Sequence, residues 1–134
     1  MTRLPKAVRE QVQKRAQGRC EYCHRPEAYT PYDYHVDHII SRKHRGSDEL
    51  TNLAWACVRC NGNKGTDVGA FDPQDGVLTT LFNPRTQAWD DHFQLDEALI
   101  VGKTAIGRAT ALLLDMNHPA QVQTRTALIK TGLW

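Results

Sequence analysis

The segment Cys57-Val58-Arg59-Cys60-Asn61-Gly62-Asn63-Lys64 completes a pattern that Cys20-Glu21-Tyr22-Cys23 begins. The two Cys-x-x-Cys pairs supply four thiols, which is the number that a tetrahedral structural Zn²⁺ requires. Each pair forms a tight chelate, and the 33 residues between Cys23 and Cys57 are enough to bring the pairs together. The spacing therefore predicts a structural zinc site made by Cys20, Cys23, Cys57 and Cys60.

Other roles for these cysteines are weaker. Disulfides persist in oxidising compartments, and the chain begins Met-Thr-Arg-Leu-Pro without the apolar stretch of a secretion signal. We therefore expect a cytoplasmic protein with reduced thiols. A thioredoxin-like redox site would need one Cys-x-x-Cys in a βαβ setting, and free core cysteines do not explain two matched pairs. His24 directly follows Cys23, but four thiolates already complete a tetrahedral site.

The loop between the cysteine pairs is expected to form a hairpin followed by a helix. Residues 34–40 are rich in β-branched and aromatic side chains and indicate a strand. A polar loop over residues 41–49 follows, and residues 53–56 return as a short apolar strand. Residues 59–64 begin a short helix. The predicted unit is β-β-α, with Asp37 and His38 at the end of its first strand.

This order of residue types resembles the HNH endonucleases, also described as ββα-metal nucleases on a zinc-ribbon-like scaffold. The matching pattern is Cys-x-x-Cys, Asp-His-Ile-Ile, a glycine turn, Asn-Leu and Cys-x-x-Cys-Asn-x-x-Lys. It is carried by Cys20, Cys23, Asp37, His38, Ile39, Ile40, Gly46, Asn52, Leu53, Cys57, Cys60, Asn61 and Lys64. The resemblance covers roughly residues 5–66. The remainder resembles an extension found on one bacterial branch of these proteins.

The same residues suit phosphodiester hydrolysis on chemical grounds. The reaction needs an activated water and stabilisation of charge on the phosphoryl group. Imidazole can take a proton from water near neutral pH, which suits His38 as a general base. Asp37 and Asn61 offer the hard oxygen ligands that Mg²⁺ or Mn²⁺ prefers. The resemblance implies that these two residues hold one divalent ion, and that cleavage leaves 5′-phosphate and 3′-hydroxyl ends.

The resemblance also gives a role to Asn52, which would brace the loop and help to hold the catalytic His38. From the residues alone, an Asn between a polar loop and an apolar strand is a turn residue. Some family members carry His where this chain has Asn61, and the Asn favours hard ions over zinc or nickel in the catalytic site. The chain departs from the family at Ser41, where many members have Pro, and at the single Gly46 in place of Gly-Gly.

Strand geometry limits how Asp37 and His38 can cooperate. Successive side chains along a regular strand face opposite sides, so the strand must twist, bulge or end here. His35 shares the face of Asp37 under strict alternation. It is a supporting partner of the site, an extra ligand of its ion, or a half-exposed strand histidine without such a role. Lys64, one helical turn after Asn61, either contacts a phosphate, braces the site or is exposed to solvent.

Positive charge is concentrated in the first half of the chain, although the net charge is only +2. Residues 1–70 hold 12 Lys and Arg against 8 Asp and Glu, whereas residues 71–134 hold 5 against 7. The first half would therefore face a polyanion, with Arg42, Lys43 and Arg45 as candidate DNA contacts. We see no base-reading motif and expect weak sequence preference.

Outside this unit the sequence predicts scaffold elements. They are a helix over residues 5–17, a strand over 77–82 after a turn at 72–76, a hairpin of 93–95 and 99–101, a helix from Thr104 to Met116, and a last helix from His118 to about residue 130. His92 is expected to be a partly buried structural histidine. Arg108 lies near the start of a predicted helix, where the helix dipole is positive and a cation is unfavourable. A bound phosphate, an acidic partner or simple exposure to solvent would explain an Arg at this position.

With 134 residues and 40% hydrophobic content, the chain is long enough for one α+β domain. We expect residues 1–68 to form the nuclease core with its N-terminal helix, and residues 69–134 to form an extension with a β-hairpin and helices packed on it. The expected activity is a metal-dependent endonuclease acting on double-stranded DNA, with structural Zn²⁺, catalytic Mg²⁺ or Mn²⁺ and no membrane contact.

One such site cuts one strand, so double-strand cleavage would need a homodimer. The alternative is a zinc-ribbon module without cleavage, which binds DNA or serves as an interaction domain in a larger nuclease or defence assembly. The presence of Asp37, His38 and Asn61 favours the enzyme.

Overall fold

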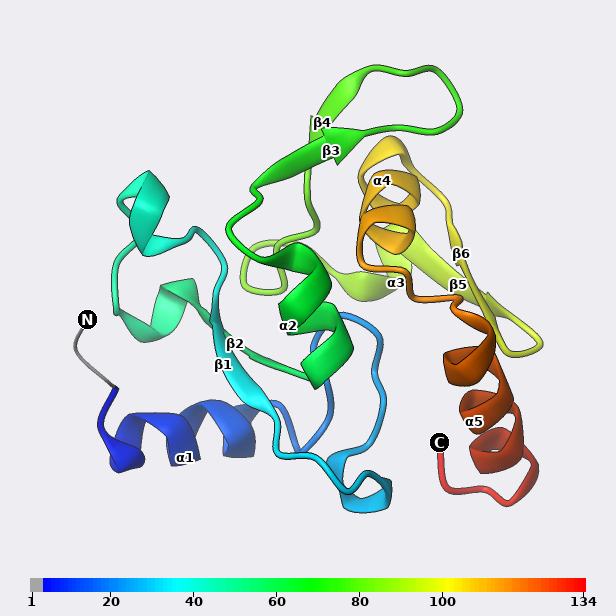
Figure 1. Cartoon of the computed structure of the whole chain (residues 1–134), viewed down its shortest axis with the longest axis horizontal. Coiled ribbons are helices and arrows are strands. Elements are labelled where there is room, and N and C mark those ends of the chain that lie inside the picture. The colour runs from blue at the N-terminus through cyan, green and yellow to red at the C-terminus, as the bar shows by residue number, and fades with distance from the viewer. Residues whose placement is uncertain (1–3) are drawn as a thin grey trace.

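The computed structural model describes residues 4–134, and in that part of the chain the fold is α+β, as predicted (Figure 1). Residues 1–3 of the predicted core lie outside it. The α-helices are α1 (Lys6–Arg15), α2 (Val58–Lys64), α3 (Trp89–His92), α4 (Ala105–Leu113) and α5 (Pro119–Lys130). The strands are β1 (His35–His38), β2 (Leu53–Ala56), β3 (Gly69–Phe71), β4 (Leu78–Thr80), β5 (Phe93–Asp96) and β6 (Leu99–Gly102), which form three antiparallel hairpins.

The β1–β2 hairpin and α2 form the predicted β-β-α unit. The register sets Asp37 opposite Ala54 and His38 opposite Leu53. All four residues of β2 are buried, because α1 packs against this strand. The helix α2 begins directly after Cys57, whose sulfur caps it by accepting a hydrogen bond from a backbone N–H. Strand β1 ends at His38, two residues earlier than predicted. Because His38 is the last residue of the strand, its side chain is not required to face away from that of Asp37, as it would be within a regular strand.

One hydrophobic core joins the two halves of the chain. Buried side chains from the cysteine-rich half contact buried side chains from the second half; they are Val12, Tyr22, Tyr34, Leu53 and Trp55 from the first, and Phe82, Phe93, Ile100, Leu114 and Met116 from the second. Burial of apolar surface on this scale is the main favourable term in folding. The second half therefore packs on the β-β-α unit, and Figure 1 shows α3, α4 and the β5–β6 hairpin gathered beside α2.

The second half follows the predictions with differences at the ends of elements. The predicted hairpin is β5–β6, and β4 lies within predicted strand 77–82. Strand β3 and the short helix α3 were not predicted. Helix α4 ends at Leu113 rather than Met116, because Asp115 adopts a left-handed backbone with φ 52°. Among residues 4–134, no helix is long and apolar enough to span a membrane.

Two polar contacts tie the second half together. The Arg108 guanidinium donates from Nε and Nη2 to the two oxygens of Asp72 at 2.9 and 2.7 Å, so an acidic partner explains this cation. The contact joins α4 to the β3–β4 hairpin. His92 is half-buried, and its Nδ1 lies 2.7 Å from Thr104 Oγ1, next to the ring of Phe82. The predicted structural role for His92 agrees with this position.

Candidate functional site

The four cysteines converge on one point. Their sulfur atoms all lie within 4.8 Å of one another, and all four residues are buried. Cys23 Sγ and Cys57 Sγ lie 3.8 Å apart, much farther than the length of a disulfide bond. The backbone N–H groups of Cys23 and Cys60 donate to Cys20 Sγ and Cys57 Sγ at 3.5 and 3.4 Å. In each Cys-x-x-Cys pair, the sulfur of the first cysteine therefore already accepts a backbone hydrogen bond.

The chemistry of this cluster fits structural Zn²⁺. Thiolates bind zinc at about 2.3 Å, so the sulfurs of a tetrahedral site lie about 3.8 Å apart. Burial raises the pKa of the Cys20 thiol, because a thiolate is costly away from water. A cation is therefore needed to hold four thiolates in this place. We name this group the zinc clamp: Cys20, Cys23, Cys57 and Cys60.

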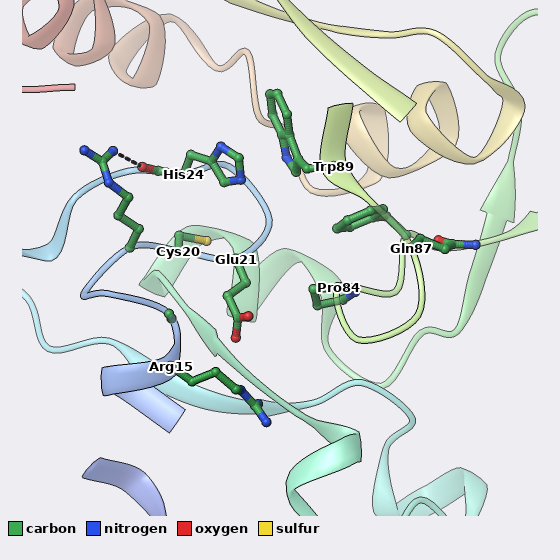
Figure 2. A pocket seen from close by; sticks show the side chains of 10 residues that line it. Arg15, Cys20, Glu21, His24, Pro84, Gln87 and Trp89 are labelled. Carbon is green, nitrogen blue, oxygen red and sulfur yellow. Dashed lines mark hydrogen bonds between the residues drawn. The ribbon is translucent and has the colours of Figure 1, made fainter. Parts of the chain in front are cut away.

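His24 lies beside the zinc clamp without joining it. Its ring stacks on Trp89 with the ring centroids 4.2 Å apart. Burial lowers the pKa of His24 to about 4, so the ring is neutral near pH 7. Figure 2 shows both side chains at a pocket that Cys20, Glu21 and Pro84 also line. The segment that begins at Pro84 therefore lies close to Cys20 of the zinc clamp.

Asp37 is buried between the zinc clamp and α2. The Tyr22 hydroxyl donates to Asp37 Oδ2 at 2.6 Å, and Lys64 Nζ lies 3.2 Å from both carboxylate oxygens. Burial raises the pKa of Asp37, although the Lys64 charge and the Tyr22 bond oppose the rise. Lys64 is itself buried and also donates to the His38 carbonyl at 3.0 Å, so it braces this strand end. A carboxylate has about four acceptor positions, which leaves Asp37 room for an ion.

His38 is held by a residue that the sequence analysis missed. Its Nε2 lies 2.8 Å from Asp48 Oδ1, and Arg42 Nε and Nη2 each lie 3.0 Å from the same oxygen. The hydrogen bonds from His38 and Arg42 lower the pKa of Asp48, so its carboxylate is ionised near neutral pH. The His38 side chain is only 17% exposed, whereas that of Asp48 is 52% exposed.

Asn52 braces the loop between the two strands. Its Oδ1 accepts from the Ile40 N–H at 2.9 Å, and its Nδ2 donates to the carbonyls of Ile40 and Ser47 at 2.9 and 2.8 Å. Gly46 permits this closure, because a Cβ there would lie 1.6 Å from the Ile40 carbonyl oxygen. Within residues 4–134, no hydrogen bond joins the Asn52 side chain to the His38 ring. The structure thus gives Asn52 a bracing contact with the loop alone.

Asp37, His38 and Asn61 line one cleft of about 560 Å³. Asp37 and His38 come from the end of β1, and Asn61 comes from α2, which packs beside that strand. Asn61 is half-buried, and its side chain makes no hydrogen bond to another residue of the described chain. Its amide oxygen is therefore free to bind a ligand in the cleft. The arrangement places two hard oxygen donors and one imidazole around a common space.

The remaining predicted residues divide between the cleft and the outer surface. Arg42 and Lys43 line the cleft, so two cations reach it from the loop. Arg45 is exposed, has a left-handed backbone with φ 67°, and does not line the cleft. His35 is exposed, its side chain forms no hydrogen bond with another residue of 4–134, and it is also outside the cleft lining. The structure brings Lys64 to the site and leaves His35 and Arg45 away from it.

Tyr22 and Asp48 contact the cleft residues although neither was predicted as a site residue. The position of Tyr22 inside the first Cys-x-x-Cys could have shown that it lies near the zinc clamp, but not that its hydroxyl reaches Asp37. Asp48 lies ten residues after His38, and no sequence motif or helical or strand periodicity links the two positions. Only the path of the loop brings the carboxylate to the ring.

Comparison with known proteins identifies the segment that holds these residues. Residues 20–67 match the family model described as HNH endonuclease. No curated protein and no solved structure matched the chain. The matched segment contains the zinc clamp, both strands of the β1–β2 hairpin and α2. It therefore also contains Asp37, His38 and Asn61, which line the cleft. Residues 20–67 of this chain, just over a third of its length, therefore resemble an HNH endonuclease domain.

Proposed function

We propose that this protein is a metal-dependent endonuclease that hydrolyses phosphodiester bonds in DNA. The observation that carries the proposal is the cleft shared by Asp37, His38 and Asn61 inside an HNH domain. A general base, two hard oxygen ligands and nearby cations are the parts that hydrolysis of a phosphodiester requires. The family also has members without activity, so the choice rests on the chemistry of these side chains.

Each residue has one task in this proposal. His38 takes a proton from the attacking water, and the Asp37 carboxylate and Asn61 amide oxygen would hold Mg²⁺ or Mn²⁺. When bound, such an ion would supply stabilisation of negative charge on the phosphoryl oxygens. Lys64 and Tyr22 hold the Asp37 carboxylate in place by hydrogen bonds, and Asp37 also lines the cleft. The hard oxygen donors suit Mg²⁺ or Mn²⁺ better than zinc.

The substrate is a polyanion on this account. Arg42 and Lys43 line the cleft together with His38, and Arg9 of α1 also lines it. Arg and Lys side chains around a hydrolytic cleft suit contacts with phosphates of the DNA backbone, and these contacts carry little sequence information. We therefore propose double-stranded DNA with weak sequence preference as the substrate. A monomer would nick it, and a homodimer would be needed to cut both strands.

The test is cleavage of supercoiled plasmid by zinc-loaded protein in Mg²⁺, Mn²⁺ or chelator. Wild type is compared with His38→Ala, and His35→Ala is a matched control because His35 lies on the same strand and is exposed. We expect metal-dependent nicking by wild type and by His35→Ala, and a loss of at least about 100-fold in His38→Ala.

A different outcome would favour the binding module. If wild type binds DNA but leaves plasmid, linear duplex, single strands and RNA intact with every metal, the nuclease proposal is wrong. Zinc content and thermal unfolding of each variant show whether the zinc clamp and the fold are retained, so a folding defect is not mistaken for a lost base.

A further inference from the structure

We infer that Asp48 is a positioning residue for His38: its carboxylate holds the imidazole with the proton on Nε2, which leaves Nδ1 to accept the proton of water. The position of the proton follows from the contact alone, whereas its use in catalysis rests on the proposed nuclease function. Asp48 would act through His38 and would touch neither substrate nor metal.

The contact between the two side chains fixes the tautomer. His38 Nε2 lies 2.8 Å from Asp48 Oδ1, and an ionised carboxylate can only accept a hydrogen bond. Nε2 must therefore carry a proton, and in the neutral ring Nδ1 then has a free lone pair. Across residues 4–134, Nδ1 has no hydrogen-bond partner of its own. A neutral imidazole without Asp48 would divide its proton between the two nitrogens.

The cleft is lined by the His38 side chain but not by the carboxylate that holds it. His38 and Arg42 line the cleft, and Asp48 is not among its lining residues. The imidazole therefore reaches the space where water and phosphate would bind, whereas Asp48 contacts that space only through its two partners. Arg42 donates a hydrogen bond from Nε to Asp48 Oδ1 and forms an ion pair with it through Nη2, so the positive charge of Arg42 offsets the negative charge that Asp48 would present to a phosphate.

The loop holds Asp48 in place from both sides. Ser47, just before it, is bound through its carbonyl to Asn52 Nδ2 at 2.8 Å, and the Ser47 hydroxyl accepts from the Glu49 N–H at 3.3 Å. The close approach of Gly46 to Ile40 fixes the same turn. Asn52 is thus linked to the His38 ring through the loop and the Asp48 carboxylate, rather than by direct contact.

The first test observes the proton itself. In ¹⁵N-labelled, zinc-loaded protein, the ring nitrogens of His38 are assigned by comparison with His38→Gln, at a pH where the ring is neutral. We expect a protonated Nε2 and an unprotonated Nδ1 in wild type, and a mixture of the two forms in Asp48→Ala. A proton on Nδ1 in wild type, or an unchanged pattern in Asp48→Ala, would overturn the inference.

The second test measures turnover in Asp48→Asn with Glu49→Gln as the matched control. Both changes remove one negative charge from the same exposed loop, but the Glu49 side chain forms no hydrogen bond in the described structure. We expect Asp48→Asn to lower kcat by about 10-fold or more without raising KM, which is part of the 10²- to 10⁴-fold that a general base supplies. Glu49→Gln should retain the wild-type kcat.

The two tests separate the inference from the proposed function. An equal kcat in Asp48→Asn and Glu49→Gln would show that Asp48 does not position the base. A higher kcat in Asp48→Asn would show that the carboxylate restrains the ring instead, which would also overturn the inference. If wild type cuts no nucleic acid, the proposed function fails, and the ring-nitrogen measurement still decides whether Asp48 sets the tautomer.

Discussion

The Tyr22 hydroxyl donates a 2.6 Å hydrogen bond to the buried carboxylate of Asp37. Tyr22 lies between Cys20 and Cys23, so the first loop of the zinc clamp directly contacts the end of strand β1. A residue of the structural site thus helps to set the position of a residue in the cleft. Zinc binding and the geometry of the cleft should therefore depend on each other.

Replacement of Tyr22 by Phe tests this link. The ring is fully buried and Phe fills nearly the same space, so the main loss is the hydrogen bond to Asp37. Because a buried carboxylate loses a partner, we expect the free energy of unfolding to fall by about 1–3 kcal/mol. Urea unfolding in excess zinc measures this change. An unfolding free energy equal to that of wild type would show that Asp37 does not depend on Tyr22.

Lys64→Met removes the cation that offsets the buried charge of Asp37. Breaking a buried pair by removing one partner costs about 3–5 kcal/mol, because the other charge is left without compensation. The double variant Asp37→Asn/Lys64→Met should be more stable than Lys64→Met alone, since the buried carboxylate is then gone. The same urea unfolding measures all variants. Additive effects of the two changes would contradict the pairing of these side chains.

Removal of zinc should unfold the HNH domain. Structural zinc contributes about 10–16 kcal/mol of apparent binding free energy in small zinc domains, and here the four ligands hold the segments on both sides of the β1–β2 hairpin. We expect one zinc per chain by elemental analysis, loss of helical circular dichroism on chelation, and loss of bound zinc in Cys57→Ser. A fully folded, zinc-free wild type would contradict the proposed structural role.

The Asp72–Arg108 pair predicts a pH dependence of stability. The hydrogen bonds from Arg108 lower the pKa of Asp72 in the folded protein. The pair therefore stabilises the fold fully above the ordinary Asp pKa of about 3.9, and this stabilisation is lost as the pH falls through the lower folded value.

Unfolding of Asp72→Asn beside wild type at several pH values tests this dependence. The variant should be less stable at neutral pH, and the difference should shrink as the pH falls below the ordinary Asp pKa of about 3.9. A difference that is constant with pH would show that the contact does not act through the Asp72 charge.

Most of the zinc clamp and of the β-β-α unit could be predicted from the sequence, because metal-ligand spacing and strand composition are local features. The four cysteines, strand β2 and helix α2 lie close to their predicted positions. Strand β3 was missed because it has only three residues, with Gly69 among them, and is defined by its pairing with β4. Helix α3 was missed because its four residues are too few for a periodic pattern.

The partners of the cleft residues could not be predicted, because they depend on contacts between distant segments. Tyr22 reaches Asp37 across 15 positions, and Asp48 reaches His38 across 10. Under strict alternation His35 shared a face with Asp37, but it lies at the outer end of β1 and remains exposed. The residues of the site could therefore be predicted from the sequence, whereas the hydrogen bonds that orient their side chains could be seen only in the folded structure.

The most direct test of the proposed nuclease is the Mn²⁺ dependence of the single-turnover cleavage rate of wild type, Asn61→Ala and His38→Ala, with DNA held saturating. If Asn61 helps to hold the ion and His38 is the base, Asn61→Ala should need a higher Mn²⁺ concentration for half-maximal rate. His38→Ala should keep that concentration and lose at least about 100-fold of the maximal rate. Cleavage that needs no divalent ion, or a wild-type maximal rate in His38→Ala, would contradict this account.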